Sequence, residues 1–270
     1  MISVIKILFF GDVVGKIGRH GLRKALPNLE KKYKPDLLIA NGENLAHGLG
    51  ITKKILLEMR EMGFDFLTSG NHIWKKREIE DIFQDSVLSK GIIRPANWPE
   101  GALGKGAELL KVGKFSVLVI NLMGRVFIQQ DLDCPFRKLD QILAQYNKKK
   151  INAILIDFHG EATSEKVAMG WYVDGRVSAV LGTHTHIGTA DAKILPQGTA
   201  YITDVGMVGA KDSVIGVKKE QPLAGFLTQL PQAFEPPEKG EVTINGVYLE
   251  IDPKTKKAKK IERVDLETIV

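Results

Sequence analysis

The sequence predicts an α/β fold with two β-sheets packed face to face and helices outside them. In the first half of the chain, short apolar runs alternate with stretches of helical period, the pattern of parallel strands joined by helices. In the second half, short strands follow one another with fewer helices, which is typical of antiparallel pairing. The third observation is that five apolar runs end in carboxylates, amides or imidazoles. Ligands of open α/β sheets bind at the carboxyl ends of strands, so these residues form the candidate site.

Three strand-and-helix units make up the first part of the chain. We expect strands over residues 5–10, 36–40 and 64–68, and helices over residues 18–33, from 52 onward and over 75–83. Apolar residues recur at helical spacing in the first helix, but Pro27 lies inside it and is compatible with a kink or an early break near Ala25. Thr52 is the expected N-cap of the second helix, because its hydroxyl can accept a hydrogen bond from a free backbone N–H.

The rest of the chain predicts a second set of strands. A hairpin over residues 107–112 and 115–121 precedes a helix over 137–148, a strand over 153–158, a helical stretch over 164–171 and a strand over 176–181. Later strands are expected over 193–195, 200–204, 241–251 and 260–264. Residues 205–238 hold several Gly and Pro residues without periodicity, so we expect a long loop there. The sequence contains no repeat or clear linker, so we expect one domain over residues 1–270.

Composition places the chain among ordinary soluble globular proteins. Of its 270 residues, 44% are hydrophobic and 26% are charged, which excludes a disordered or fibrous chain. The net charge of +6, from 38 basic and 32 acidic residues, is a mild surplus that suits an anionic substrate and leaves contact with RNA open. Part of this surplus lies in residues 254–260, a lysine-rich run without aromatic residues that we interpret as a solvated hairpin turn.

The sequence predicts a cytoplasmic protein without a membrane span. Cys134 is the only cysteine, so an internal disulfide is excluded and a reducing compartment is expected. The apolar N-terminal run has no basic flank before it and no small-residue cleavage site, so we interpret it as the first strand rather than a signal peptide. No apolar stretch approaches the ~20 residues that cross a bilayer. Assembly into a homo-oligomer stays open.

Two of the five polar strand ends carry carboxylates. Asp12 follows the first apolar run in a Gly-Asp turn, where it can bind a metal ion; a plain turn or helix cap is the alternative. Glu43 and Asn44 follow the second run. A carboxylate can bridge two metal ions and an adjacent amide oxygen can add a ligand, whereas the alternative is a polar loop that caps the next helix.

Two further strand ends carry imidazoles, and one of them also carries an amide. Asn71 and His72 follow the third run, where an amide oxygen can bind a metal ion while the next histidine faces the substrate. The alternative is a turn in which the asparagine bonds its own backbone. His159 follows a later run, although a lone histidine there is more often a surface group. The adjacent Asp157 and Glu161 are readily explained as solvated or capping groups.

The fifth strand end carries two histidines. His184 and His186 lie two positions apart in an extended segment, so their imidazoles point to the same face and suit metal ligation; two exposed histidines are the alternative. Separate explanations do not account for all five motifs at strand ends, and mixed oxygen and nitrogen donors suit a pair of transition-metal ions. His20, expected on an exposed helix face, and His47, in the glycine-rich loop after Glu43, fall outside this pattern, and contact of His47 with substrate is left open.

In this order the motifs resemble those of the calcineurin-like metallophosphoesterases. The series is Gly-Asp, an acidic strand-end loop, Gly-Asn-His, a lone His and Gly-Thr-His-Thr-His. The YmdB-like branch matches better than the broad superfamily, because the variant positions agree as well. Val14 stands where the superfamily has the histidine of Asp-x-His, and residues 41–44 replace Gly-Asp-x-x-Asp. The resemblance spans the chain from Asp12 to about residue 209.

The resemblance implies a four-layer α/β/β/α sandwich that holds two divalent or trivalent metal ions, with iron or manganese expected. Carried over by position, the ligands of the first ion are Asp12, Glu43, Asn44 and His186, and those of the second are Glu43, Asn71, His159 and His184. Glu43 therefore bridges the two ions, and Asn44 supplies the ligand that Val14 cannot.

The resemblance also implies a phosphodiesterase that acts on cyclic nucleotides, including 2′,3′-cyclic monophosphates, and leaves activity on 3′,5′-cyclic monophosphates open. A hydroxide shared by the two ions would attack phosphorus while His72 protonates the leaving oxygen as general acid. Two alternatives stay open. One is a phosphomonoesterase or protein phosphatase that uses the same site, and the other is a non-catalytic regulator that binds RNA or a protein through its basic surface.

Overall fold

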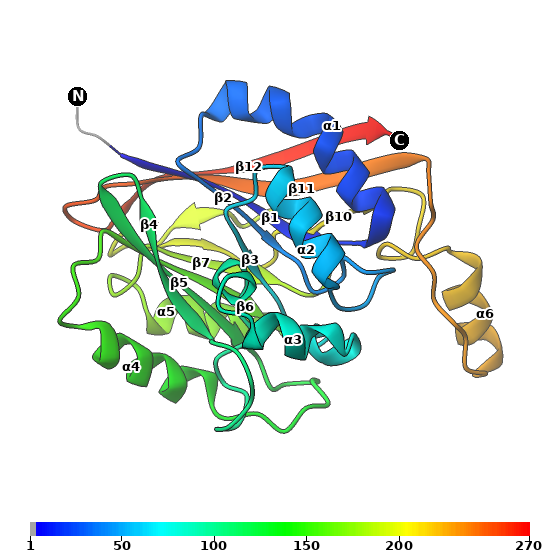
Figure 1. Ribbon diagram of the computed structural model, residues 1–270, viewed down its shortest axis with the longest axis horizontal. Helices are drawn as coiled ribbons and strands as arrows, with labels where there is room; N and C mark the ends of the chain where they lie inside the picture. Colours follow the sequence, from blue (N-terminus) through cyan, green and yellow to red (C-terminus); the bar gives the residue numbers. More distant parts are fainter. Residues whose placement is uncertain (1–3) are drawn as a thin grey trace.

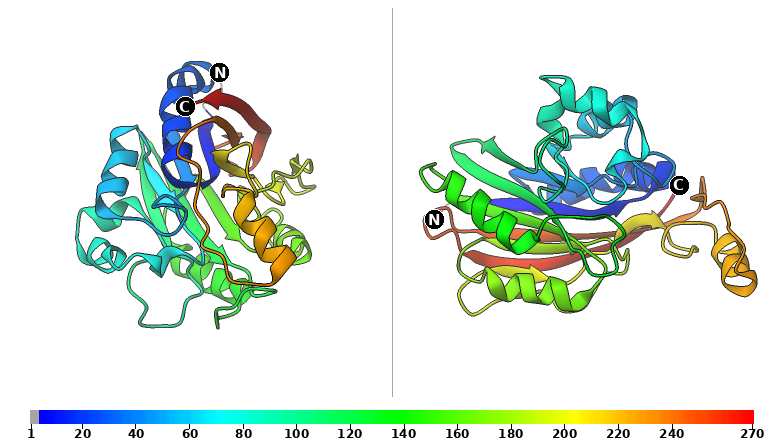
Figure 2. Two further views of the ribbon diagram at one scale, coloured as in Figure 1. Left: turned by 90° about the vertical axis from the view of Figure 1, so that its right-hand side faces the viewer. Right: turned by 90° about the horizontal axis from the view of Figure 1, so that it is seen from below.

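The computed structural model describes residues 4–270, which form four layers: two β-sheets pack face to face, and helices cover their outer sides (Figures 1 and 2). Each sheet has six strands. The α/β/β/α architecture expected from the sequence is confirmed. It arises because the central strands are apolar on both faces, so each sheet must be covered on two sides.

The first sheet has the strand order β12-β11-β10-β1-β2-β3, and β11 also pairs with β1. Its members are β1 (Ile5–Val13), β2 (Leu37–Asn41), β3 (Phe66–Thr68), β10 (Met207–Ala210), β11 (Glu241–Ile251) and β12 (Ala258–Ile269). The first part of β1 pairs antiparallel with β11, whereas its last two residues pair in parallel with β10. β1, β2 and β3 are parallel, so their carboxyl ends lie at one edge of the sheet.

The second sheet has the strand order β4-β5-β6-β7-β9-β8. Its members are β4 (Ala107–Val112), β5 (Phe115–Met123), β6 (Ala153–His159), β7 (Ala179–Thr183), β8 (Lys193–Ile194) and β9 (Ala200–Ile202). β4 and β5 form the expected antiparallel hairpin, and β5, β6, β7 and β9 run parallel. The carboxyl ends of β6 and β7 therefore also share one edge.

Side chains of β1 alternate between two cores, as the period of a strand requires. Ile7 and Phe9 face the second sheet, where they join a buried cluster that includes Leu155 of β6. Leu8 and Phe10 face the opposite way, toward the helices. Both faces of the strand are therefore buried, which explains why the N-terminal run is almost continuously apolar.

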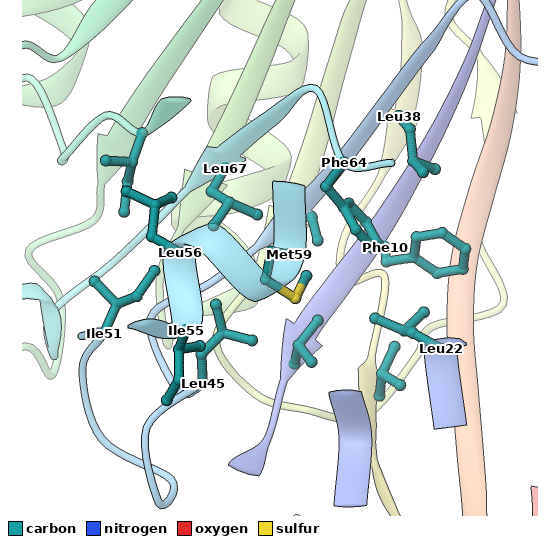
Figure 3. Close-up of a cluster of buried hydrophobic side chains, with 14 of the residues drawn as sticks. Phe10, Leu22, Leu38, Leu45, Ile51, Ile55, Leu56, Met59, Phe64 and Leu67 are labelled. Carbon is teal, nitrogen blue, oxygen red and sulfur yellow. The ribbon is translucent and has the colours of Figure 1, made fainter. Parts of the chain in front are cut away.

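Helices cover the two outer faces. The first sheet is covered by α1 (Gly15–Tyr33), α2 (Lys53–Glu61) and α3 (Glu78–Gln84), and the second by α4 (Pro135–Tyr146) and α5 (Thr163–Tyr172). Figure 3 shows apolar side chains of α2, among them Met59, packed with residues of the first sheet and its loops. Phe10 and Phe64 meet there edge to face, with ring centroids 6.0 Å apart. Such pairs add about 0.5–1.5 kcal/mol beyond the area they bury.

The structure decides two expectations about helices, one about Pro27 inside α1 and one about the N-cap of α2. α1 continues through Pro27 to Tyr33 without a break, because Leu26, Leu29 and Tyr33 are buried and hold the second half of the helix against the sheet. Thr52 is the N-cap of α2, where its Oγ1 accepts a hydrogen bond from the N–H of Ile55 at 3.4 Å. The prediction that Thr52 is the N-cap is therefore confirmed.

Three expectations about elements were wrong. The stretch 205–238 is not all loop, because it contains β10 and the helix α6 (Glu220–Thr228). The helix expected over 75–83 is divided into a 3₁₀ turn, η1 (Ile73–Lys75), and α3; a second 3₁₀ turn, η2 (Leu88–Gly91), follows. The lysine-rich run is a turn only in its first part, since Ala258 is buried and already begins β12. Among residues 4–270, no helix is long and apolar enough to cross a membrane.

Candidate metal centre

The carboxyl ends of β1, β2, β3, β6 and β7 bring all eight predicted site residues together where the two sheets meet. Two placements correct the sequence analysis. Asp12 lies inside β1 rather than in a turn after it, because the strand continues to Val13 through its pairing with β10. His159 is the last residue of β6 rather than a residue beyond it, and its side chain is fully buried.

Three of these residues surround the Nε2 atom of a fourth, His159. Asn71 Oδ1 lies 2.9 Å from it, His184 Nδ1 3.0 Å and Glu43 Oε2 3.2 Å. Atoms of Glu43, His159 and His184 thus form a compact donor cluster suited to a metal ion. The residues come from both sheets, and they bring two oxygens and two nitrogens together.

The other residues gather beside Asp12. His186 Nε2 lies 3.8 Å from Asp12 Oδ1 and 3.1 Å from the amide nitrogen of Asn44. That amide nitrogen also donates to Glu43 Oε1 at 3.2 Å, so Glu43 contacts both groups of donors. As the amide stands, its oxygen faces His72, and ligation through the oxygen requires the amide group to turn over.

His72 stands at the rim of this cluster. Its Nδ1 lies 2.9 Å from Asn44 Oδ1 and 3.5 Å from Glu43 Oε1, and its backbone N–H donates to Glu43 Oε2. The bond to Asn44 assigns the Nδ1 proton and leaves Nε2 free. Burial lowers the pKa of this imidazole below its usual value.

Hydrogen bonds on the far side of each imidazole fix its orientation. Thr183 Oγ1 donates to Asp157 and therefore accepts from His159 Nδ1, at 2.9 Å. His186 Nδ1 donates to the carbonyl of Ile215 at 2.7 Å. In both rings Nε2 is therefore the nitrogen that is left to bind a metal ion. This arrangement is common among histidines that bind metals.

His184 has the reverse arrangement. Its Nε2 contacts Glu161 Oε2 at 3.1 Å, so Nδ1 is the atom that faces His159. Its backbone N–H donates to Asp12 Oδ2 at 3.0 Å. Glu161, which the sequence analysis treated as a capping or solvated group, therefore orients an imidazole of the site.

Sequence reasoning missed Asp157. It was expected to be solvated but is 1% exposed, and it accepts hydrogen bonds from Thr183, Thr68 and Asn41. Burial raises the pKa of its carboxyl group to about 6. Its donors lie 26 to 116 positions away in the chain, so no local pattern could reveal this network.

A buried ion pair behind the histidine loop was also missed. Lys166 Nζ donates to Asp204 Oδ2 at 2.7 Å, and both side chains are 1% exposed. The same carboxylate accepts from the N–H and the hydroxyl of Thr185, which lies between the two histidines of the loop. Asp204 therefore anchors the segment that carries His184 and His186.

The backbone is unusual where the site requires it. His184 and His186 have φ angles of 104° and 65°, a region that side-chain-bearing residues rarely adopt. Such strain concentrates at functional sites and must be held by surrounding contacts. At Gly70 a Cβ atom would lie 2.2 Å from Glu43 Oε2 and 2.3 Å from His159 Nε2, so only glycine fits there.

The charges of the cluster are mutually dependent. Burial disfavours a charged imidazole at His159, but the carboxylates of Glu43 and Asp12 outweigh it and raise the pKa to about 9. Burial likewise opposes ionisation of Glu43, yet the charge on His159 holds its pKa well below the usual range. Burial and the same charge lower the pKa of His184 to about 3. A proton on His159 thus balances the negative charge of the Glu43 and Asp12 carboxylates in the metal-free protein.

One observation tests directly whether a metal ion fits. Asp12 Oδ1 is buried and has no hydrogen-bond partner within the described residues, although its carboxylate is fully enclosed. A buried unpaired oxygen is costly unless a cation or water completes it. Burial correspondingly raises the pKa of Asp12. Together with the imidazoles of His159 and His186, this carboxylate belongs to a mixed oxygen and nitrogen donor set that suits manganese, iron or zinc.

The two histidines outside the pattern lie apart from this cluster. His20 lies half-buried in α1 rather than on an exposed face, whereas His47 is exposed in the loop after Glu43 and lines a pocket that Asn44 and His72 also line. Contact of His47 with substrate, which the sequence leaves open, is compatible with this placement.

Comparison with known proteins places the chain among phosphoesterases. The family model for YmdB-like proteins matches residues 8–264. The chain is 51% identical, over 96% of each chain, to the 2′,3′-cyclic-nucleotide 2′-phosphodiesterase of Bacillus subtilis. The crystal structure of a novel phosphatase from Mycoplasma pneumoniae superposes with a TM-score of 0.91 at 36% identity, covering 99% of this chain and 95% of that one.

A more distant likeness shows the fold alone. A 5′-nucleotidase precursor from Thermus thermophilus superposes with a TM-score of 0.58 at 13% identity, covering 99% of this chain and 55% of that one.

Proposed function

Because the chain belongs to the YmdB-like family, it is a phosphodiesterase, and we propose that its substrates are nucleoside 2′,3′-cyclic monophosphates, hydrolysed at a dinuclear metal centre. The observation that carries the proposal is the position of Glu43. Its two carboxylate oxygens contact two groups of donors, one around His159 and one beside Asp12. A carboxylate in that position is suited to bridge two ions.

The ligands of the proposed centre divide into two sets. The first set is Asp12, Glu43, Asn44 and His186, and the second is Glu43, Asn71, His159 and His184. When bound, a pair of metal ions stabilises negative charge on the phosphodiester and lowers the pKa of water toward about 7. Iron and manganese both suit these mixed oxygen and nitrogen donors, and we propose one of them as the resident metal.

His72 is the proposed general acid. Asn44 Oδ1 holds its Nδ1, so Nε2 is free to carry a proton to the leaving ribose oxygen. Burial lowers its pKa, which makes the protonated ring a stronger acid. Proton transfer from a positioned side chain typically contributes ~10²–10⁴-fold to the rate.

The proposal is tested by measuring metal content and substrate preference on the same preparation. Elemental analysis of the purified protein is expected to give two equivalents of transition metal. Hydrolysis of 2′,3′-cAMP, 3′,5′-cAMP and bis-p-nitrophenyl phosphate is measured alongside p-nitrophenyl phosphate. Preference for 2′,3′-cAMP supports the proposal, whereas equal or faster turnover of the monoester contradicts it.

A second candidate is a phosphomonoesterase or protein phosphatase on the same site. The similarity to the novel phosphatase of Mycoplasma pneumoniae favours it, because the two structures cover almost the whole of each other. The monoester in the panel above, together with a phosphoserine peptide, separates this activity from the diesterase. Activity toward 3′,5′-cAMP would extend the substrate range without changing the proposed centre.

A further inference from the structure

An apolar pocket opens directly beside the proposed metal centre. Its volume is about 600 Å³, within the usual range for small-molecule sites, and Asn44, His72 and His186 form part of its wall. Asn44 and His186 are proposed metal ligands, and His72 is the proposed general acid. A molecule whose phosphate lies at the metal centre would therefore place its adjoining group in this pocket.

The opposite wall comes from the segment that the sequence analysis expected to be loop. α6 and the chain after it project from the body of the protein (Figures 1 and 2). From this segment Phe226 and Phe234 line the pocket, although they are 73% and 55% exposed. Ile215, whose carbonyl holds His186 Nδ1, also lines it and is 47% exposed.

Exposed aromatic side chains around a cavity require an explanation, because large apolar patches on a surface mark binding sites. Two phenylalanines on one side of a pocket provide faces on which a planar ring can stack. Stacking of a nucleic-acid base on an aromatic side chain accepts every base, since each has a π-face. The polar side chains of His47 and Gln232 also line the pocket and can bond the edge of a base.

We propose that this pocket binds the nucleobase of the substrate, with Phe226 and Phe234 as the residues that select a nucleoside cyclic phosphate over other phosphodiesters. The inference deepens the proposed function and rests on it. The connection is the shared wall: Asn44, His72 and His186 belong to the proposed catalytic site and also line the pocket, so base and phosphate of one nucleotide can be bound together.

The test compares two substrates on single variants. Adenosine 2′,3′-cyclic phosphate carries the base, whereas methyl ribofuranoside 2′,3′-cyclic phosphate has the same cyclic diester without one. Phe226→Ala and Phe234→Ala are expected to raise KM for the adenosine substrate about tenfold with kcat little changed, because stacking is made equally in the ground state and transition state. Turnover of the base-free substrate should be unaffected.

Leu227→Ala is the matched control. Leu227 lies on the same helix and is 84% exposed, but it is not among the residues that line the pocket. Its variant should behave like the unaltered protein on both substrates. Phe226→Trp, which keeps an aromatic face, should restore most of the affinity lost in Phe226→Ala. Light scattering and thermal unfolding of each variant test whether assembly and fold are unchanged.

Three results would overturn the inference. One is an equal loss of kcat/KM on the two substrates, and another is an equal effect of Leu227→Ala and Phe226→Ala. The third is a change in oligomeric state that accompanies the kinetic change, which would assign the apolar face to a second copy of the chain. Each differs from failure of the proposed function, in which the unaltered protein itself does not hydrolyse the adenosine substrate.

Discussion

His159 Nε2 and Glu43 Oε2 lie 3.2 Å apart and connect the two sheets at the centre of the site. Glu43 follows β2 of the first sheet, and His159 ends β6 of the second. Both side chains are buried, so the pair is shielded from solvent and its charges act strongly on each other. The packing of the two sheets thus determines the spacing of the proposed ligands.

Replacing Glu43 by Gln should disrupt both proposed metal sites. The amide keeps the size of the side chain but cannot bridge two cations with two charged oxygens. We expect elemental analysis to show loss of most bound metal and hydrolysis of 2′,3′-cAMP to fall to background. Glu61→Gln, an exposed residue of α2, serves as the control and should retain metal and activity. Two equivalents of metal in the Glu43 variant would contradict the bridging assignment.

Replacing His72 by Ala should separate catalysis from metal binding. The side chain lies at the rim and bonds Asn44, so its loss should leave the metal content unchanged. Turnover should fall by ~10²–10⁴-fold, because the leaving oxygen then departs without a positioned proton donor. His20→Ala in α1 is the matched control and should have normal kinetics. Loss of a metal equivalent from the His72 variant would make His72 a ligand instead.

Metal affinity should rise with pH up to about 9. The pKa of His159 is raised to about 9 in the metal-free protein, so below that pH an ion must displace its proton. Binding therefore releases protons, and the apparent affinity increases as the pH rises toward 9 and then levels off. Calorimetric titrations with manganese in buffers of different ionisation enthalpy measure this release. An affinity that is constant between about pH 6 and 9 would show that His159 carries no proton there.

Replacing Lys166 by Met should destabilise the protein strongly. Lys166 is buried against Asp204, and removing one partner of a buried pair typically costs about 3–5 kcal/mol because the other charge is left uncompensated. Denaturant unfolding of the metal-free protein measures the loss. Lys149→Met, at an exposed position, should change the free energy of unfolding by less than about 0.5 kcal/mol. A double variant that also carries Asp204→Asn should recover part of the lost stability.

Much of the site is readable in the sequence because its residues follow strands. The apolar runs before Asp12, Asn71 and His159 predict strands, and parallel strands place their carboxyl ends at one edge. His184 and His186 also lie at the site, but the extended segment expected from their spacing was wrong: β7 ends at Thr183, and both histidines follow it with positive φ angles. Local patterns of burial and period therefore determined the fold class and the candidate ligands.

The tertiary structure alone decided the hydrogen-bond partners and the wall of the pocket. Asp157 looked solvated because Thr68 and Asn41, which bond it, lie 89 and 116 positions away. β10 was missed because its four residues are stabilised by pairing with β1 and β11 rather than by any pattern of their own. α6 was missed because Pro222 is its one buried residue, so the helix has no apolar stripe whose period could reveal it. A periodic pattern records which face of an element is buried, whereas contacts between distant segments depend on how those elements pack in space.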